Sequence, residues 1–158
     1  MPKTTQSVQY AAQVAAAVKF GDRLNDKRQI EGTPQTALIK VVVDALNVAT
    51  DVITLLELPP GSVVLPELSK IIMTDDATSG ALTIDIGDVV DPDRYCDGAN
   101  CAATGVVDFL TPAFPAGFGT RHYTDAATST TLVTATLATF GATIEAGEFY
   151  VLLAYKSL

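Results

Sequence analysis

Hydrophobic and polar residues alternate along most of the chain from residue 37 onward, which is the pattern of β-strands with one buried face. In GALTIDIGD (80–88) the hydrophobic side chains occupy every second position: Leu82, Ile84 and Ile86. In TLVTATL, within 128–140, the same spacing recurs at Val133, Ala135 and Leu137. Threonine and aspartate fill the positions between them, so each strand is expected to bury one face and expose the other.

Turn residues divide the chain into short segments that fit strands and not helices. Pro59-Pro60-Gly61, Pro66 and Asp75-Asp76 each interrupt a β-branched or hydrophobic run. The predicted strands are 37–46, 51–58, 62–65, 68–74, 80–88, 104–110, 128–140 and 147–158. Turn signals every 8–12 residues are typical of an antiparallel sandwich or barrel, and no helical pattern separates the strands. The sequence therefore predicts an all-β fold, an antiparallel β-sandwich that could take the jelly-roll form.

Residues 1–36 differ from the segment that follows. They contain a weak helical stripe of small side chains from Val8 to Val18, then a polar run that ends at Gly32 and Pro34. Few large hydrophobic residues are present, so this segment cannot form a core of its own. We therefore expect an extended N-terminal arm (1–36), which lies on the body or reaches for a partner, followed by a sandwich domain (37–158).

The last predicted strand is hydrophobic on both faces. Phe149, Val151, Leu153 and Tyr155 would line one face, and Tyr150, Leu152 and Ala154 the other. A surface strand of a monomeric sandwich normally keeps one polar face. Either another chain or the N-terminal segment covers this strand, or it is a central strand with a loop folded over it.

Composition and charge exclude several classes of partner. The chain has 158 residues, of which 48% are hydrophobic, and a net charge of −8. It has no hydrophobic run of about 18 residues, as a membrane span would need. The acidic balance argues against nucleic-acid binding. Residues 1–40 carry six basic and three acidic side chains, so the arm is mildly basic, and it either docks on an acidic surface or is simply solvated. The start is interpreted as mature sequence and not as a signal peptide.

Little in the sequence supports catalysis. His122 is the only histidine, no nucleophile motif of the G-x-S-x-G type is present, and no phosphate-binding or dinucleotide-binding motif occurs. Zinc would have only Cys96, Cys101 and His122 as nitrogen or sulfur ligands, one short of a structural site. A Cys–His pair, and a carboxylate pair acting on sugars, stay open as alternatives, although the chain has no tryptophan. We expect no catalytic residue, no cofactor and no metal site.

The stretch IDIGDVVDPDRYCDGANC (84–101) contains five aspartates and both cysteines. The spacing of its acids fails the EF-hand pattern, but an irregular calcium site using Asp88, Asp91, Asp93 or Asp97 stays open. Asp91-Pro92 and Asp97-Gly98 are turn dipeptides. Arg94 lies between Asp91, Asp93 and Asp97 in the sequence and is expected to neutralise part of this cluster. We favour a structural turn. We expect reduced thiols, and Cys96 and Cys101 could form a disulfide that closes a small ring only in an oxidising medium.

Three segments carry a resemblance to a known class of protein: ITLLELPPGSVVLP, LTIDIGDVVDPDRY and the closing AGEFYVLLAYK. Over residues 37–158 the chain resembles head decoration (cement) proteins of tailed bacteriophages. The resemblance implies a non-enzymatic virion protein, assembled in the host cytoplasm and placed on the capsid surface, where it braces neighbouring capsomers. It implies the major capsid protein as partner and a homotrimer as the assembly, with neither nucleic acid nor membrane bound.

Two other classes remain open. A phage fibre or spike-base module that binds host glycan would use the aromatic residues of FLTPAFPAGFGTRHY (109–123), among them Phe109, Phe114 and Phe118. A carbohydrate-active enzyme would use pairs of the acidic residues. The phenylalanines could instead pack on a capsid or at a trimer axis, so they do not decide between these classes.

Overall fold

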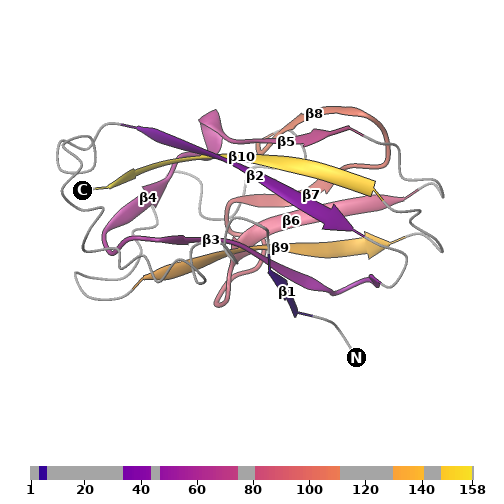
Figure 1. The fold of residues 1–158 in the computed structure, drawn as a ribbon, viewed down its shortest axis with the longest axis horizontal. Coiled ribbons are helices and arrows are strands. Elements are labelled where there is room, and N and C mark those ends of the chain that lie inside the picture. The colour runs from indigo at the N-terminus through magenta and orange to yellow at the C-terminus, as the bar shows by residue number, and fades with distance from the viewer. Residues whose placement is uncertain are drawn as a thin grey trace.

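The computed structural model describes residues 4–6, 34–43, 47–74, 81–110, 130–140 and 147–157. They form two β-sheets packed face to face, which confirms the predicted all-β sandwich (Figure 1). The elements are β1 Thr4–Gln6, β2 Gln35–Val43, β3 Val52–Leu58, β4 Ser62–Val64, the 3₁₀ helix η1 Pro66–Leu68, β5 Lys70–Met73, β6 Leu82–Asp88, β7 Cys96–Asn100, β8 Gly105–Asp108, β9 Thr131–Phe140 and β10 Gly147–Ser157.

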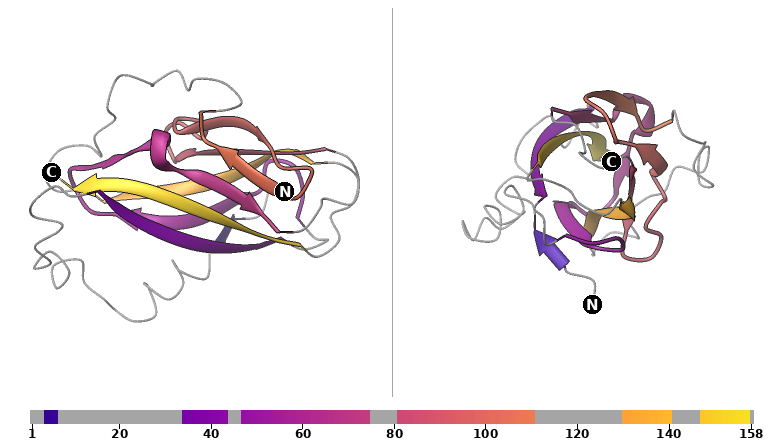
Figure 2. Two further views of the ribbon diagram at one scale, coloured as in Figure 1. Left: turned by 90° about the horizontal axis from the view of Figure 1, so that it is seen from above. Right: turned by 90° about the vertical axis from the view of Figure 1, so that its right-hand side faces the viewer.

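The strands are distributed between the sheets in jelly-roll order. Sheet A has the order β1-β3-β9-β6-β7, and sheet B has the order β2-β10-β5-β8, with β4 pairing the end of β10. If β4 and β5 are counted as one interrupted strand and β1 as an addition, eight strands form two four-stranded sheets, as in a jelly roll. Every pairing is antiparallel except that of β1 with β3. The end view shows how the two sheets curve around a common interior (Figure 2).

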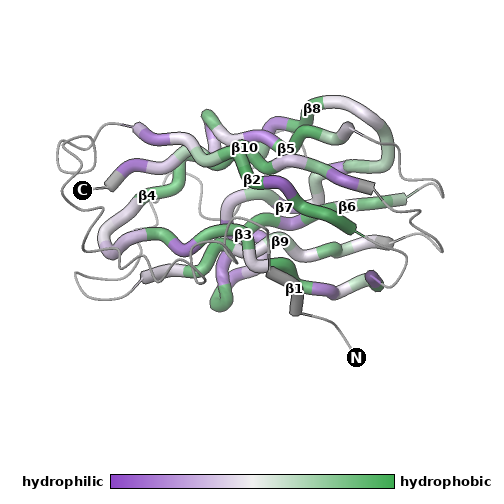
Figure 3. The backbone as a smooth tube through the Cα atoms, viewed as in Figure 1, coloured by the Kyte–Doolittle hydropathy of each residue, from purple (hydrophilic) through white to green (hydrophobic). Residues whose placement is uncertain are grey.

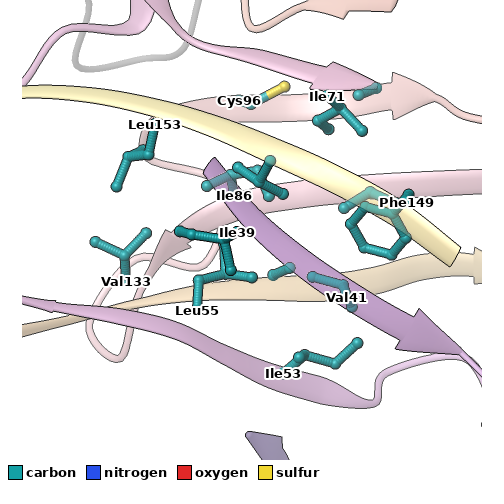
Figure 4. Packing of buried hydrophobic residues seen from close by; sticks show 14 of the residues in the cluster. Ile39, Val41, Ile53, Leu55, Ile71, Ile86, Cys96, Val133, Phe149 and Leu153 are labelled. Carbon is teal, nitrogen blue, oxygen red and sulfur yellow. The ribbon is translucent and has the colours of Figure 1, made fainter. Parts of the chain in front are cut away.

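The core lies between the sheets and is built from the alternating hydrophobic positions. Hydrophobic and hydrophilic colours alternate along the strands (Figure 3). Ile84 and Ile86 of β6 are fully buried, as are Val133 and Leu137 of β9, whereas Thr83 and Asp85 point outward. In Figure 4 side chains of both sheets, such as Leu55 and Ile39, converge in this space. The buried faces predicted for β6 and β9 are therefore confirmed, whereas Thr134, on the face of β9 that was predicted to be exposed, is buried as well.

The last strand, β10, is the central strand of sheet B. It pairs with β2 along nine residues, and on its other side with β5 and then β4. Between β4 and β5 the chain makes a turn that contains η1, and the regular β-sheet pairing with β10 is interrupted there. There Leu65 N–H donates to Ala154 O (2.8 Å), Ala154 N–H donates to Ser69 Oγ (2.9 Å), and Ser69 Oγ–H donates to Leu65 O (2.8 Å). This network satisfies the backbone of Ala154, which is fully buried. The central position of this strand is therefore confirmed, while an arm or loop folded over its outer side stays a prediction.

The structure also differs from the prediction at the ends of several strands and in two strands that the sequence did not predict. β2 begins at Gln35, two residues earlier than expected. β7 falls where the sequence predicted only a turn. β1, inside the expected arm, pairs with the edge of sheet A, with Thr5 opposite Ile53. At least this part of the arm lies on the body, while residues 7–33 are outside the described residues.

Candidate functional site

The loop of residues 88–95, which connects β6 to β7, is held by the first of its aspartates. Asp88 Oδ1 accepts hydrogen bonds from the backbone N–H groups of Val90 (2.8 Å) and Asp91 (2.9 Å). The backbone N–H of Asp88 donates to Asp91 O at 2.9 Å. A carboxylate that bonds the N–H groups of the next residues fixes a turn. This geometry agrees with the structural interpretation of the aspartates.

Arg94 neutralises part of this loop, with partners that the sequence identified only in part. Its Nε lies 3.2 Å from Asp88 Oδ2 and 3.6 Å from Asp91 Oδ2. Asp88 is buried, so this pair is better sheltered from water than a surface pair. Tyr95, next to it, is also buried, and its pKa is raised by burial and by the nearby Asp88 carboxylate.

Gly87 allows the loop to fold directly back onto the end of β6. A Cβ atom at this position would lie 2.1 Å from Asp91 O and 2.3 Å from the Pro92 carbonyl carbon. Both neighbours are backbone atoms and cannot rotate away. A glycine is therefore required here by close approach, which the sequence did not indicate.

The Asp97-Gly98 dipeptide forms a bulge inside β7 and not a turn between strands. Gly98 has a φ of 68° and its N–H donates to Asp85 Oδ1 at 2.7 Å. Two residues of β7 face the single residue Asp85 of β6, because Ile84 pairs with Ala99 and Ile86 with Cys96. Burial raises the pKa of Asp85, and the hydrogen bond from Gly98 partly opposes this.

Both cysteines are free thiols in the core. Cys96 is the first residue of β7, and Cys101 follows its last residue. Both side chains are fully buried, and no disulfide joins them. Burial raises the pKa of each thiol to about 12. The thiolate is the reactive form, so these side chains are unreactive at neutral pH.

The arrangement of acids offers little to a metal ion. Within the residues that the structure describes, no three side chains of His, Cys, Asp or Glu come together as metal ligands. The Asp88 carboxylate already accepts two N–H groups and faces Arg94. His122, the one histidine considered for catalysis or zinc, lies outside the described residues. In the same described part of the chain, no helix is long and apolar enough to cross a bilayer.

The outward side of sheet B is a second candidate for function, and we call it the sheet B outer face. Its members from β2, β5, β8 and β10 are Leu38, Lys40, Val42, Lys70, Ile72, Val106, Asp108, Glu148, Tyr150 and Leu152. Among the hydrophobic side chains, Leu38, Val42 and Val106 are more than half exposed. The others are half-buried, so a hydrophobic surface extends across all four strands.

The charged residues of the sheet B outer face are paired with each other. Lys40 bonds to Glu148, and Lys70 Nζ lies 3.0 Å from Asp108 Oδ1. The ammonium of Lys40 also lies 6.0 Å from the centre of the Tyr150 ring. Lys40 holds the pKa of Glu148 below its ordinary value. This face is thus electrically balanced in a chain of net charge −8.

Of the aromatic stretch 109–123, residues 109 and 110 belong to the part of the chain that the structure describes. Phe109 is fully buried in the core, and its N–H donates to Ser69 O at 3.2 Å. Phe109 therefore does not contribute to the glycan-binding, capsid or trimer surface considered for it from the sequence, because its side chain helps to fill the core of the sandwich. Phe114 and Phe118 lie outside the described residues.

Two solved structures with a similar fold come from phage capsids. A chain of the cyanophage Pam1 capsid asymmetric unit matches with a TM-score of 0.56 and 20% identity, over 80% of this chain and 86% of that chain. A chain of the capsid of Ralstonia phage GP4 matches with a TM-score of 0.55 and 23% identity, over 80% of this chain and 84% of that chain. No protein-family model matches the chain, and no curated protein matches it either. At these identities the likeness establishes a shared fold.

Proposed function

We propose that this protein is a non-enzymatic structural component of a phage virion, which decorates the capsid and stabilises it by bridging neighbouring capsomers. The observation that carries the proposal is the fold, which is shared over 80% of the chain with chains of two phage capsids. The resemblance of residues 37–158 to head decoration proteins supports it from the sequence side. In this role the chain needs no catalytic residue, no cofactor and no metal.

The partners in this proposal are the major capsid protein and two further copies of the chain. A homotrimer would use the sheet B outer face, because a hydrophobic surface of this extent is more than a monomer normally leaves in water. The pairing of Lys40 with Glu148 and of Lys70 with Asp108 lets a second copy approach without meeting uncompensated negative charge. Elsewhere the acidic excess would oppose such contact.

The N-terminal arm (1–36) is proposed to anchor the protein on the shell or to cross to a neighbouring subunit. Its positive charge differs in sign from that of the remaining chain. Deleting residues 1–33 should leave a folded sandwich with the circular dichroism of a β protein, although β3 loses its pairing with β1. The truncated chain should bind capsids more weakly than the full chain, and added salt should weaken binding of the full chain. Equal binding by both chains would make the arm a passive tail.

The deciding experiment is reconstitution on heads of the parent phage from which this protein has been removed. The purified full chain should bind such heads at saturable, regularly spaced positions, visible by cryo-electron microscopy, and should raise the temperature at which they open. If it binds only fibres or tail baseplates, or binds an immobilised host glycan and not heads, the decoration proposal is wrong. Hydrolysis of a glycan that is lost on Asp→Asn substitution would identify an enzyme instead.

A further inference from the structure

The tip of the 88–95 loop exposes two adjacent valines. Val89 is 76% exposed and Val90 is 85% exposed, the highest values among large hydrophobic side chains that the structure describes. The loop projects past β9 and β3 in the view of Figure 1, and its end has the hydrophobic colour in Figure 3. Isolated hydrophobic residues on a surface are ordinary, whereas these two adjacent valines form a small hydrophobic patch at a projecting tip.

The backbone that carries the valines is fixed from both sides. Asp88 Oδ1 binds the N–H of Val90, and the backbone N–H of Asp88 donates to Asp91 O. Arg94 joins the side chains of Asp88 and Asp91, and Gly87 lets the Asp91-Pro92 backbone pack on the strand end. A tip that is already ordered loses little conformational freedom on binding, which favours affinity.

The surroundings of the tip are acidic. Asp91 and Asp93 follow the valines directly, and the side chain of Asp93 is exposed. Asp93 contacts Asp91 closely enough to raise the pKa of Asp91, so the two carboxyl groups crowd one side of the tip. The only described cation of the loop, Arg94, is already engaged by Asp88 and Asp91. A matching surface must therefore be hydrophobic at its centre and basic at its margin.

We propose that the Val89-Val90 tip inserts into a hydrophobic socket rimmed by Lys or Arg on the major capsid protein. This inference rests on the proposed function, since that function supplies the partner. Phosphate groups, of nucleic acid or of lipid, would meet Asp91 and Asp93 with repulsion, which favours a protein partner. The tip lies at the end of sheet A strands, separate from the sheet B outer face, so docking on the shell and contact between copies use different surfaces.

The first test removes the hydrophobic tip and keeps the loop. Val89→Ser with Val90→Ser should weaken binding of the full chain to heads lacking this protein by about tenfold or more, since two exposed valines would otherwise be buried. Its melting temperature and its oligomeric mass should stay unchanged. The control is Val48→Ser with Leu68→Ser, which removes two exposed hydrophobic side chains outside the loop and should leave affinity unchanged.

The second test identifies what touches the tip. In Val90→Cys, a maleimide-benzophenone reagent should label only the new thiol, because Cys96 and Cys101 are buried with pKa values raised to about 12. Irradiation on reconstituted heads should join the chain to the major capsid protein. A covalent product between two copies of this chain, or equal affinity of the double serine variant and wild type, would overturn the inference while the decoration role stands. If the wild-type chain does not bind heads, the decoration role is wrong and the inference is wrong with it.

Discussion

The outer faces of the two sheets differ although both sheets share one core. On its outward side sheet A carries mainly threonine, aspartate and asparagine: Thr54, Thr83, Asp85, Asn100, Thr134 and Thr136, of which Thr54 and Thr134 are buried. Sheet B carries leucine, valine, isoleucine and tyrosine at six outward positions, beside the two ion pairs Lys40–Glu148 and Lys70–Asp108. Sheet A satisfies the ordinary rule that an antiparallel sheet has one buried and one polar face. Sheet B departs from that rule, and such departures mark contact surfaces.

The largest expected effect is the difference in the free energy of unfolding between substitutions on the inner and on the outer side of β10, a strand of sheet B. Phe149 is buried between the sheets, so Phe149→Ala should lower the free energy of unfolding by about 3–5 kcal/mol. Leu152, three residues along β10, points outward and is half-buried, so Leu152→Ala should cost roughly 1 kcal/mol or less in the monomer. Urea denaturation of both variants measures the difference. Equal losses would mean that β10 does not have one core face and one surface face.

The next effect tests whether the sheet B outer face joins copies of the chain. Leu38→Asp with Val106→Asp places two charges on this face and should weaken self-association by about a hundredfold, or roughly 3 kcal/mol. Light scattering should show the oligomer replaced by the monomer mass. The matched change on sheet A, Asn100→Asp with Thr139→Asp, alters two exposed positions and should leave the mass as it was. A monomeric wild-type chain at micromolar concentration would contradict the trimer directly.

A smaller effect is expected where the 88–95 loop meets sheet A. Gly87→Ala forces a methyl group against the backbone of Asp91 and Pro92, and should cost about 1–3 kcal/mol. The change should also disturb the loop, visible as faster amide hydrogen exchange at Val90 and Asp91. Gly105→Ala provides a control, since a Cβ there has free space, although its φ of 149° makes some backbone strain unavoidable. An unaffected exchange rate in Gly87→Ala would show that the loop does not pack on β6.

The smallest effect concerns pH, and its sign should differ between the two faces. The pKa of Asp85 on sheet A is raised from 3.8, so the folded chain holds this proton more tightly and loses stability as pH rises through the interval between the two values. The pKa of Glu148 on sheet B is lowered from 4.5, so its contribution is present above that value and is lost as pH falls through the folded value. Asp85→Asn, which keeps an acceptor for Gly98 N–H, should remove the first trend.

Melting temperatures between pH 3 and pH 6 measure both trends, with Glu148→Gln as the variant that should remove the second. The free-energy change for Asp85 should be below about 1 kcal/mol, because the side chain is partly solvated. The same slope with pH in both variants would mean that the two carboxyl groups are not held in different environments.

Sequence alternation was sufficient to predict the inner faces of β6 and β9, because only every second side chain is hydrophobic there. In β10 both faces are hydrophobic, so alternation alone could not identify its inner face. The sequence pattern identified eight of the ten strands found in the residues that the structure describes. It missed β7 because Asp97-Gly98 indicates a turn, whereas Gly98 uses its positive φ to make a bulge within the strand. It missed β1 because three polar residues carry no pattern, and only pairing with β3 makes them a strand.

The loop was predicted only in outline, for physical reasons that concern distance and burial. The role of aspartate in a turn is local and can be recognised from neighbouring residues. The ion-pair partners of Arg94 depend on how the loop folds back onto the end of β6. In the structure these partners are Asp88 and Asp91. Val89 and Val90 continue a hydrophobic strand in sequence terms, so their exposure could not be predicted without the fold.

The central place of β10 in sheet B has a consequence for how the protein is made. All of its partners, β2, β4 and β5, precede it in the chain. While the ribosome is still translating residues before 147, these strands have no central strand to join, and their hydrophobic sides remain uncovered. Nascent chains of this kind attract chaperones and proteases until the missing strand emerges. Folding of sheet B therefore follows synthesis of β10, and a ribosome stalled shortly before it would carry a protease-sensitive chain.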